Sequence, residues 1–460
     1  MIIMPREWIR MTAVWLVTLA CAFALPIAAV GATGAVSSLA GELFASITGT
    51  LAPRDADGRT NVLLLGVGDS EHTAADLTDA IVVASMEPTS RSLVLFSIPR
   101  DLYLTDSTRM APGKINGLYS IRKRAHRKEG LTATGASLLA MRDFADELEE
   151  RLDIPIHGVM KMDFIGFERM IDMVGGVDVT VPKTITDDTY PVEEGELGVF
   201  AIEAGQQHLD GKTALRYARS RHSTSDFDRS ARQQQILSAL MAKTRPRDVM
   251  ESVHLFDGIL DALRGHVEWT FLPSDLWGLA GTAAGIDRDR IITMHLSTKT
   301  GGDRSEAAPG GLVYPPPPGV AGSGSVLLPV SLTDDVSDWG QIRSLASLLF
   351  SHRDLYLTRP TVTITHAPKA KIQAQRLRNE LLRYGFTVAK AEKGPESLDM
   401  LSFLNVRGGS PSSARLAAQL SGVPFSWRSD VRSASGTEIR FSLGEEYRFV
   451  PFERRLFPQS

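Results

Sequence analysis

Arginine side chains cluster in one short stretch of a chain that is otherwise weakly acidic. The segment from Tyr217 to Gln235 reads YARSRHSTSDFDRSARQQQ and contains Arg219, Arg221, Arg229 and Arg232. The planar guanidinium of arginine binds two oxygens of a phosphate at once, so this composition favours a phosphate site. The net charge of −4 argues against a broad basic face, and we expect no nucleic acid as a partner. A solvent-exposed face of Asp–Arg pairs is the alternative interpretation.

Charged residues also stand at the ends of three apolar runs of strand length. Arg100 and Asp101 directly follow one run in SIPRDLYL, Asp69 follows NVLLLGVG, and Asp79 precedes AIVVASM. Ligands of α/β sheets bind beyond the strand ends, where neighbouring strands would bring these residues together. Two carboxylates that face arginines suit a phosphate and a divalent cation in one site, because Mg²⁺ typically takes one or two carboxylates plus phosphate oxygens. The alternatives are a local Arg100–Asp101 ion pair and turn capping by the two aspartates.

The spacing of the clustered arginines predicts where helices end. Arg219 and Arg221 are two positions apart and would point about 200° from each other on a regular helix. Both reach one ligand only if the helix stops nearby, and the segment HSTSDFD favours such a stop. The following helix would then place Arg229, Arg232 and Gln233 in its first turns, where the helix N-terminus itself favours an anion.

The pattern of apolar residues predicts two domains of mixed α and β structure. Strand-length apolar runs and amphipathic helices, among them 135–152 and 164–174, predict a layered α/β domain over residues 59–352. The Pro- and Gly-rich stretch from Lys299 to Ser325 is typical of a long surface loop within it. The order strand, helix, strand, helix, strand then predicts a small α/β domain over residues 359–460.

The N-terminal region predicts a membrane anchor. No charged residue occurs between Arg10 and Glu42, and a transmembrane helix over residues 11–36 is long enough for a bilayer. The arginines before it should keep residues 1–10 in the cytoplasm, so we expect a single-pass protein of the cell membrane whose bulk is extracytoplasmic. A cleaved signal peptide is the alternative, with cleavage near Gly31–Ala35. Cys21 is the single cysteine, which excludes an intrachain disulfide and a cysteine-based metal cluster.

Seven segments, taken in order, resemble the LytR–CpsA–Psr family of cell-wall proteins. The resemblance is strong from about residue 61 to 240 and weaker to about residue 350. The tail from Thr361 resembles the small LytR C-terminal domain that often accompanies the family. The matching segments are NVLLLG, TDAIVVAS, SIPRDLYL, KIN, DFIGFERMIDMVGGVDVTVP, AGQQHLDGKTALRYARSRH and DFDRSARQQQ.

This resemblance implies a fold and an activity. It implies a three-layer α/β/α domain around a central mixed sheet, held at the membrane by the N-terminal helix. Family members transfer a glycopolymer from a polyprenyl-(pyro)phosphate carrier onto peptidoglycan, with magnesium or another divalent cation. The chain would accordingly be a transferase, a glycopolymer–peptidoglycan phosphotransferase. Its partners would be the polyprenyl-(pyro)phosphate-linked glycopolymer, peptidoglycan and the membrane.

Roles for individual residues follow from the same resemblance, by position. Asp69 and Asp79 would be metal ligands. Arg100, Asp101 and Asp79 would act in catalysis, with Asp101 as the candidate general base. The phosphate groups would be bound by Arg100, Lys114, Arg219, Arg221, Arg229 and Gln233.

Two positions depart from the family pattern. Gly68 stands where an aspartate is common, so that Asp69 comes one position late, and Leu77 replaces an arginine shortly before Asp79. With fewer arginines in this first loop, Arg100 and the cluster after residue 217 must supply most of the positive charge. The alternatives to a transferase are a catalytically weak polyprenyl-phosphate-binding wall protein and a lipid pyrophosphate hydrolase.

Overall fold

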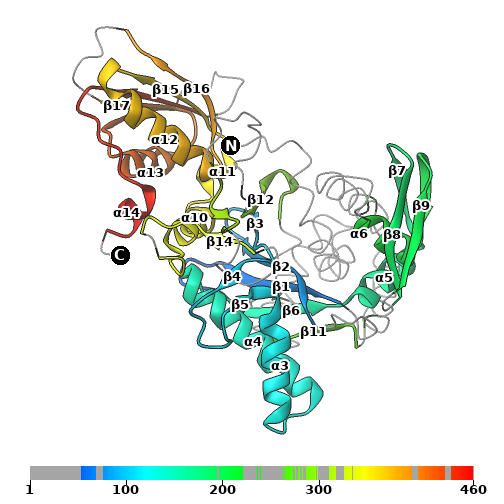
Figure 1. Ribbon diagram of the computed structural model, residues 1–460. Helices are drawn as coiled ribbons and strands as arrows, with labels where there is room; N and C mark the ends of the chain where they lie inside the picture. The colour runs from blue at the N-terminus through cyan, green and yellow to red at the C-terminus, as the bar shows by residue number, and fades with distance from the viewer. Residues whose placement is uncertain are drawn as a thin grey trace, which may run out of the picture. The chain divides into compact units, whose positions relative to one another are not determined.

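The chain divides into two compact units (Figure 1). Among the described residues, the first comprises those in the ranges 53–149 and 155–295, and the second comprises those in the ranges 150–154 and 296–458. The computed structural model describes residues 53–68, 76–193, 196–220, 236, 239, 263, 265–272, 275, 278–279, 282, 286–296, 298, 310–317, 326–333, 335–395, 402–429 and 437–458.

A six-stranded mixed sheet forms the centre of the first unit. Its strand order is β11-β6-β1-β2-β3-β12, in which β2 and β11 run opposite to the other four strands. Every residue of β1 is buried, as expected for a strand that is covered on both faces. The prediction of a central mixed sheet is therefore confirmed. The strands are β1 Thr60–Val67, β2 Thr78–Glu87, β3 Ser92–Ser97, β6 Gly158–Met162, β11 Val267–Trp269 and β12 Ile291–His295.

Helices approach this sheet from both faces. Successive side chains of a strand point to opposite faces. On β6, Met160 and Met162 join an apolar core that includes residues of α5 (Phe164–Met173) and α6 (Gly211–Arg219). Lys161, between them, contacts side chains of α3 (Leu118–Lys128) and α4 (Ala133–Leu152) instead. The layered α/β prediction is thus confirmed for this sheet.

The sequence pattern does not predict helix α3. Five of its 11 residues are lysine or arginine, yet the helix buries Leu118 and Tyr119.

Short strands and turns complete the first unit. The remaining elements are β4 Tyr103–Leu104, β5 Gly113–Lys114, the 3-10 turns Ile115–Gly117 and Arg288–Arg290, β7 Val177–Val181, β8 Ile185–Glu193, β9 Glu196–Ile202 and β10 Gly205–Leu209.

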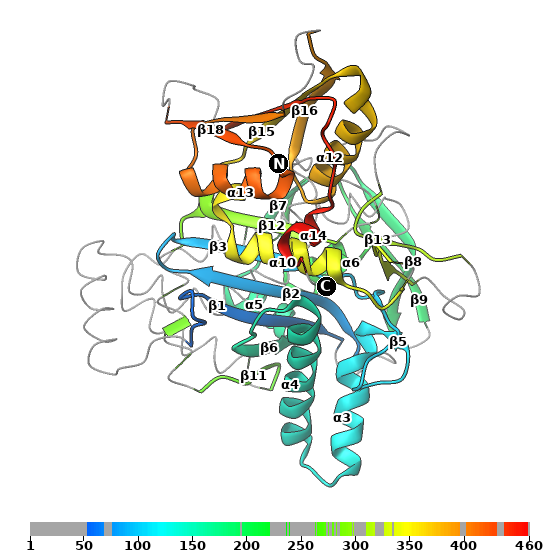
Figure 2. The same cartoon turned by 90° about the vertical axis from the view of Figure 1, so that its left-hand side faces the viewer.

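The second unit contains a five-stranded sheet with the order β16-β15-β19-β17-β18. Three of its strands, β15, β16 and β18, are labelled in Figure 2. Helices α12 and α13 pack against this sheet around a core that includes Leu381, Leu420 and Phe441. Glu380 of α12 is buried and accepts a hydrogen bond from the amide of Phe452 at 2.9 Å, and burial raises the pKa of this carboxyl. The elements of the second unit are β13 Val313–Tyr314, β14 Leu328–Pro329, α10 Gly340–Ser351, α11 Asp354–Leu357, β15 Thr361–His366, the 3-10 turn Pro368–Ala370, α12 Lys371–Arg383, β16 Thr387–Lys393, β17 Phe403–Arg407, α13 Pro411–Ser421, β18 Phe425–Arg428, β19 Glu438–Leu443 and α14 Phe452–Leu456.

The predicted membrane anchor lies outside the described residues. Within the part of the chain that the structure describes, no helix is both long and apolar enough to cross a bilayer. The span over residues 11–36 and Cys21 fall before residue 53, the first residue described.

Candidate functional site

Three strand ends meet at one edge of the first unit's sheet. Because β1 and β3 run antiparallel to β2, which lies between them, their carboxyl ends lie beside the amino end of β2. Asp79 is the second residue of β2, and Arg100 follows the end of β3 at Ser97 by three positions. The topology therefore brings Asp79 and Arg100 to the same edge.

Arg100 lies between two carboxylates at this edge. Its Nη1 donates a hydrogen bond of 2.5 Å to Oδ1 of Asp79, and its Nε lies 3.8 Å from Oδ2 of Asp101. Nζ of Lys114 lies 2.7 Å from Oδ1 of Asp101. The side chains of Arg100 and Asp79 are 36% and 35% exposed, so a ligand can reach them from solvent. The structure brings these four predicted residues together, and it also forms the local Arg100–Asp101 ion pair that the sequence offered as the alternative.

The KIN segment fixes the backbone around these side chains. The amide of Asn116 donates to the carbonyl of Arg100 at 3.3 Å, and the carbonyl of Asn116 accepts a hydrogen bond of 3.1 Å from the hydroxyl of Thr78. Because Thr78 and Asp79 are consecutive, Asn116 joins the chain segments that hold the two partners of the Arg100–Asp79 ion pair.

The formal charges of the four side chains cancel. Arg100 and Lys114 supply two positive charges, and Asp79 and Asp101 supply two negative ones. Charge-assisted hydrogen bonds of this kind are stronger than neutral ones, so an incoming phosphate must compete with the carboxylates for the two cations. Additional positive charge at this edge would favour the phosphate.

Helix α6 leads toward the arginine cluster. It begins at the N-cap Asp210, which accepts a hydrogen bond of 2.7 Å from the amide of Thr213, and hydrogen bonds from Thr213 lower the pKa of this carboxyl. Arg219 is the last residue of α6 and Ser220 is its C-cap, so the helix stops close to where the sequence predicts. The other predicted residues, Asp69, Arg221, Arg229 and Gln233, lie outside the described residues.

The start of α6 lies directly against α5. A Cβ atom at Gly211 would be only 2.1 Å from the carbonyl oxygen of Glu168. The amide of Gly211 also donates a hydrogen bond of 2.7 Å to Oδ1 of Asp172. Glycine permits this close approach of two backbones because it has no Cβ. The contact fixes the position from which α6 runs to Arg219.

The carboxylates at the edge suit a hard divalent cation. Oδ1 of Asp79 is bound by Nη1 of Arg100. Mg²⁺ accepts one or two carboxylates and completes its shell with water and phosphate oxygens, so Asp79 and Asp101 offer a suitable partial set. No group of three or more His, Cys, Asp or Glu residues is placed to hold a metal ion within the described part of the chain. A bound phosphate would therefore have to supply part of the coordination.

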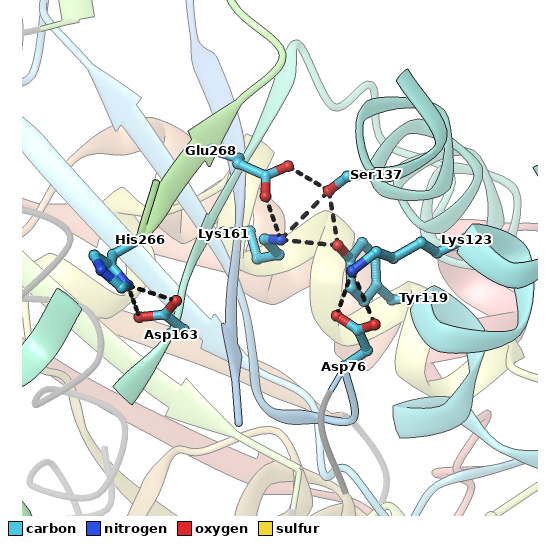
Figure 3. Close-up of polar contacts among 8 residues, drawn as sticks. All are labelled: Asp76, Tyr119, Lys123, Ser137, Lys161, Asp163, His266 and Glu268. Atoms are coloured by element: carbon cyan, nitrogen blue, oxygen red, sulfur yellow. Dashed lines mark hydrogen bonds and ion pairs between the residues drawn. The ribbon is translucent and has the colours of Figure 1, made fainter. Parts of the chain in front are cut away.

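A second polar cluster lies between β6 and the helices α3 and α4, and sequence reasoning missed it (Figure 3). Nζ of Lys161 lies 2.8 Å from Oε1 of Glu268, 2.8 Å from the hydroxyl of Tyr119 and 3.3 Å from the hydroxyl of Ser137. Burial raises the pKa of the Tyr119 hydroxyl well above its usual value. The one sequence signal is a lysine inside the apolar strand GVMKM, because a buried lysine requires a partner.

Two further pairs are visible in the same view (Figure 3). Nζ of Lys123 on α3 lies 2.7 and 2.8 Å from the two carboxylate oxygens of Asp76. Nδ1 of His266 lies 2.9 Å from Oδ2 of Asp163, whose Oδ1 caps α5 by accepting a hydrogen bond from the amide of Gly166. Of the two pairs, Lys123–Asp76 is the one close in sequence to Asp79.

A comparison with protein families decides the classification. The model described as the LytR_cpsA_psr family matches residues 37–312, which is more than half of the chain. The chain belongs to the LytR_cpsA_psr family. The matched range includes all the residues of the candidate site, among them the segments after residue 217. The predicted family resemblance is therefore confirmed.

The chain is similar in sequence to several named proteins of the bacterial cell wall. The chain is 29% identical over 242 residues to the polyisoprenyl-teichoic acid–peptidoglycan teichoic acid transferase TagV of Bacillus subtilis, covering 52% of this chain and 56% of the relative. It is 28% identical over 232 residues to the cell wall biosynthesis protein LcpA of Corynebacterium glutamicum, covering 47% and 42%. The crystal structure of B. subtilis TagV is similar at 23% identity with a TM-score of 0.42, covering 65% of this chain and 99% of that chain. The chain spans about half the length of these curated relatives.

Proposed function

We propose that the chain is a membrane-anchored phosphotransferase that moves a glycopolymer from a polyprenyl-(pyro)phosphate carrier onto peptidoglycan. Membership of the LytR_cpsA_psr family supports a role in the cell wall. The names of its relatives, which are teichoic acid–peptidoglycan transferases, support transfer of an anionic polymer. The span over residues 11–36 would hold the site on the extracytoplasmic side of the cell membrane.

One structural observation supports this proposal most directly. Arg100 bridges Asp79 and Asp101 at an exposed sheet edge, beside Lys114. Two cations and two carboxylates in contact are the parts that a phosphate group and a divalent cation require together. The arrangement suits phosphoryl transfer, in which catalysis depends on positioning and on neutralising phosphate charge.

In the proposed reaction, a hydroxyl group of peptidoglycan attacks the phosphorus that joins the glycopolymer to its carrier. A new P–O bond forms, the P–O bond to the lipid phosphate breaks, and the lipid phosphate leaves. Arg100 and Lys114 would bind the non-bridging phosphate oxygens. Asp101, oriented by Lys114, would accept the proton of the attacking hydroxyl. A magnesium ion held by Asp79 would supply further charge neutralisation on the phosphates.

A reconstituted reaction tests this proposal. The full-length chain in detergent would be supplied with a polyprenyl-pyrophosphate-linked glycan, peptidoglycan and Mg²⁺. We expect polymer to become attached to peptidoglycan. Free phosphate without attachment would instead indicate the lipid pyrophosphate hydrolase, and retention of the lipid without turnover would indicate a binding protein of the wall. Either of these outcomes would overturn the proposed transfer.

A further inference from the structure

We propose that the ion pair between Lys123 and Asp76 positions the carboxylate of Asp79 and thereby shapes the phosphate site. This inference rests on the proposed function only in that Asp79 serves that site. Asp76 precedes Asp79 by three residues, and neither Lys123 nor Asp76 is among the residues that the family resemblance implies.

The backbone of Asp76 has an unusual conformation. Its φ is +69°, in the left-handed region that residues with a Cβ rarely occupy. Such a conformation persists only where the surrounding contacts hold it, and it is found most often in turns and functional sites. Aspartate tolerates the region better than most residues because its short side chain bonds locally. The turn immediately before β2 therefore depends on what Asp76 binds.

Lys123 is the residue that binds the side chain of Asp76. Nζ of Lys123 contacts both carboxylate oxygens of Asp76, at 2.7 and 2.8 Å. The two side chains are 25% and 33% exposed, so the pair is partly buried. A partly buried pair is screened less by salt than a fully exposed one. The pair thus joins α3 to the turn that starts β2 across 47 positions of sequence.

Lys123 is itself held by a rigid support. It lies one helical turn after Tyr119, with its Nζ 5.6 Å from the centre of the aromatic ring. The Tyr119 ring is fully buried, and its hydroxyl contacts both Ser137 of α4 and Lys161 of β6 (Figure 3). Lys161 in turn pairs with Glu268 of β11. A charged side chain on a helix that is fixed in this way can hold its partner at one position.

A second contact holds the same strand end. The Thr78 hydroxyl donates to the carbonyl of Asn116, two residues before α3 begins at Leu118. The start of β2 is therefore held at Asp76 by the middle of α3 and at Thr78 by the segment that leads into α3. Asp79 is the next residue, and its carboxylate meets Arg100 at 2.5 Å. Without the Lys123–Asp76 pair, only the hydrogen bond from Thr78 to Asn116 would remain of these two contacts. The carboxylate of Asp79 would then be held less firmly opposite Arg100.

Variants of the pair test the inference in the full-length chain. Lys123→Met keeps the apolar stem and removes the charge, and Asp76→Asn keeps a residue that tolerates positive φ while removing the carboxylate. Arg122→Met is the matched control, because Arg122 is the adjacent residue of α3 and contacts Asp143 of α4 at 2.5 Å instead. Asp76→Gly is a fourth variant. Glycine adopts the positive φ without strain but has no side chain that could pair with Lys123, so this variant removes the ion pair without straining the backbone.

Two measurements test how firmly the start of β2 is held and whether the phosphate site depends on it. Hydrogen–deuterium exchange of the peptide that contains residues 76–82 should be faster in Lys123→Met, Asp76→Asn and Asp76→Gly than in wild type and Arg122→Met. Calorimetry would measure the affinity for farnesyl pyrophosphate in the presence of Mg²⁺, and this affinity should fall by about tenfold in the same three variants. Loss of a residue that orients a metal ligand typically costs about 10- to 100-fold in affinity. The double variant Asp76→Asn/Lys123→Met should be no worse than either single variant, because the two residues act through one contact.

The outcomes separate this inference from the proposed function. If exchange at residues 76–82 is the same in the pair variants as in wild type, the positioning role is wrong, whatever the protein catalyses. If exchange rises in the pair variants but wild type transfers no polymer to peptidoglycan, the positioning role stands and the proposed function fails. If Arg122→Met alters exchange as strongly as Lys123→Met, the effect belongs to α3 in general and the pair has no special role.

Discussion

Lys161 and Glu268 face each other across neighbouring strands, with Nζ of the lysine 2.8 Å from Oε1 of the glutamate. Lys161 is buried on β6, and Glu268 is the middle residue of β11. The same ammonium group contacts the hydroxyl of Tyr119, so one charge links the edge strand of the sheet to helix α3. Removal of the lysine would leave a carboxylate and two hydroxyl groups without their shared partner.

Lys161→Met should therefore destabilise the protein. Loss of one partner of a buried pair costs about 3–5 kcal/mol, and because Glu268 is partly exposed we expect about 1–3 kcal/mol. Urea denaturation of the full-length chain would measure the free energy of unfolding. Lys369→Met is the control, since Lys369 pairs with Glu445 at the surface of the second unit and should cost at most about 1 kcal/mol. Equal effects of the two substitutions would contradict a structural role for the Lys161 cluster.

Arg100→Ala should abolish most of the proposed transfer activity without unfolding the chain. Removal of one donor that stabilises developing charge typically lowers kcat by about 100- to 1,000-fold. Arg100→Lys should retain more activity, because lysine keeps the charge but loses the planar fork that binds two oxygens. Arg91→Ala serves as the comparison, as Arg91 pairs with Asp287 at the other end of β3. Wild-type rates in Arg100→Ala would remove Arg100 from the site.

His295 should make stability depend on pH. Both of its ring nitrogens are buried, and burial lowers the pKa of His295 to about 4. As the pH falls from about 6.5 toward 4, the unfolded chain takes up a proton that the folded chain does not. The free energy of unfolding should then fall, by on the order of 3 kcal/mol over this window.

Denaturation curves at pH 7 and pH 4.5 would measure this loss of stability. His295→Met should reduce it, because the variant has no imidazole to protonate in the unfolded chain. An unchanged pH dependence in His295→Met would show that other groups cause it.

Gly211→Ala should disturb the contact between α5 and α6. The new Cβ would meet the backbone oxygen of Glu168 at 2.1 Å, so one helix must move. Overpacking of this kind costs about 1–3 kcal/mol, measured as a lowered midpoint of thermal unfolding. Gly135→Ala in the first turn of α4 is the comparison, because its Cβ would lie 3.1 Å from the hydroxyl of Thr132, a side chain that can shift more easily than a backbone, so we expect a smaller loss of stability. A neutral Gly211→Ala variant would show that the two helices adjust freely.

Part of the site could be predicted from the sequence because it depends on local patterns. The apolar runs around residues 61–67, 80–86 and 92–98 are long enough to identify strands. Charged residues at the ends of such strands converge whenever the strands are neighbours. Arg100 and Asp79 meet for this reason, and they are only 21 positions apart.

The buried clusters could not be predicted, because they depend on pairing between distant segments. Lys161 and Glu268 are 107 positions apart and meet only through the register of β6 with β11. Lys123 lies on a helix whose basic composition hides its buried face. Positive φ at Asp76 also leaves no signal in a sequence, since aspartate is common in turns of every kind.

The most direct test of the proposed function is the covalent product. The full-length chain would be incubated with a polyprenyl-pyrophosphate-linked glycopolymer, peptidoglycan and Mg²⁺, and the peptidoglycan would then be digested and examined by mass spectrometry. We expect muropeptides that bear the glycopolymer through a phosphodiester, formed by wild type and lost in Asp79→Asn and after chelation of the metal. Consumption of the lipid-linked donor without any such muropeptide would contradict the account.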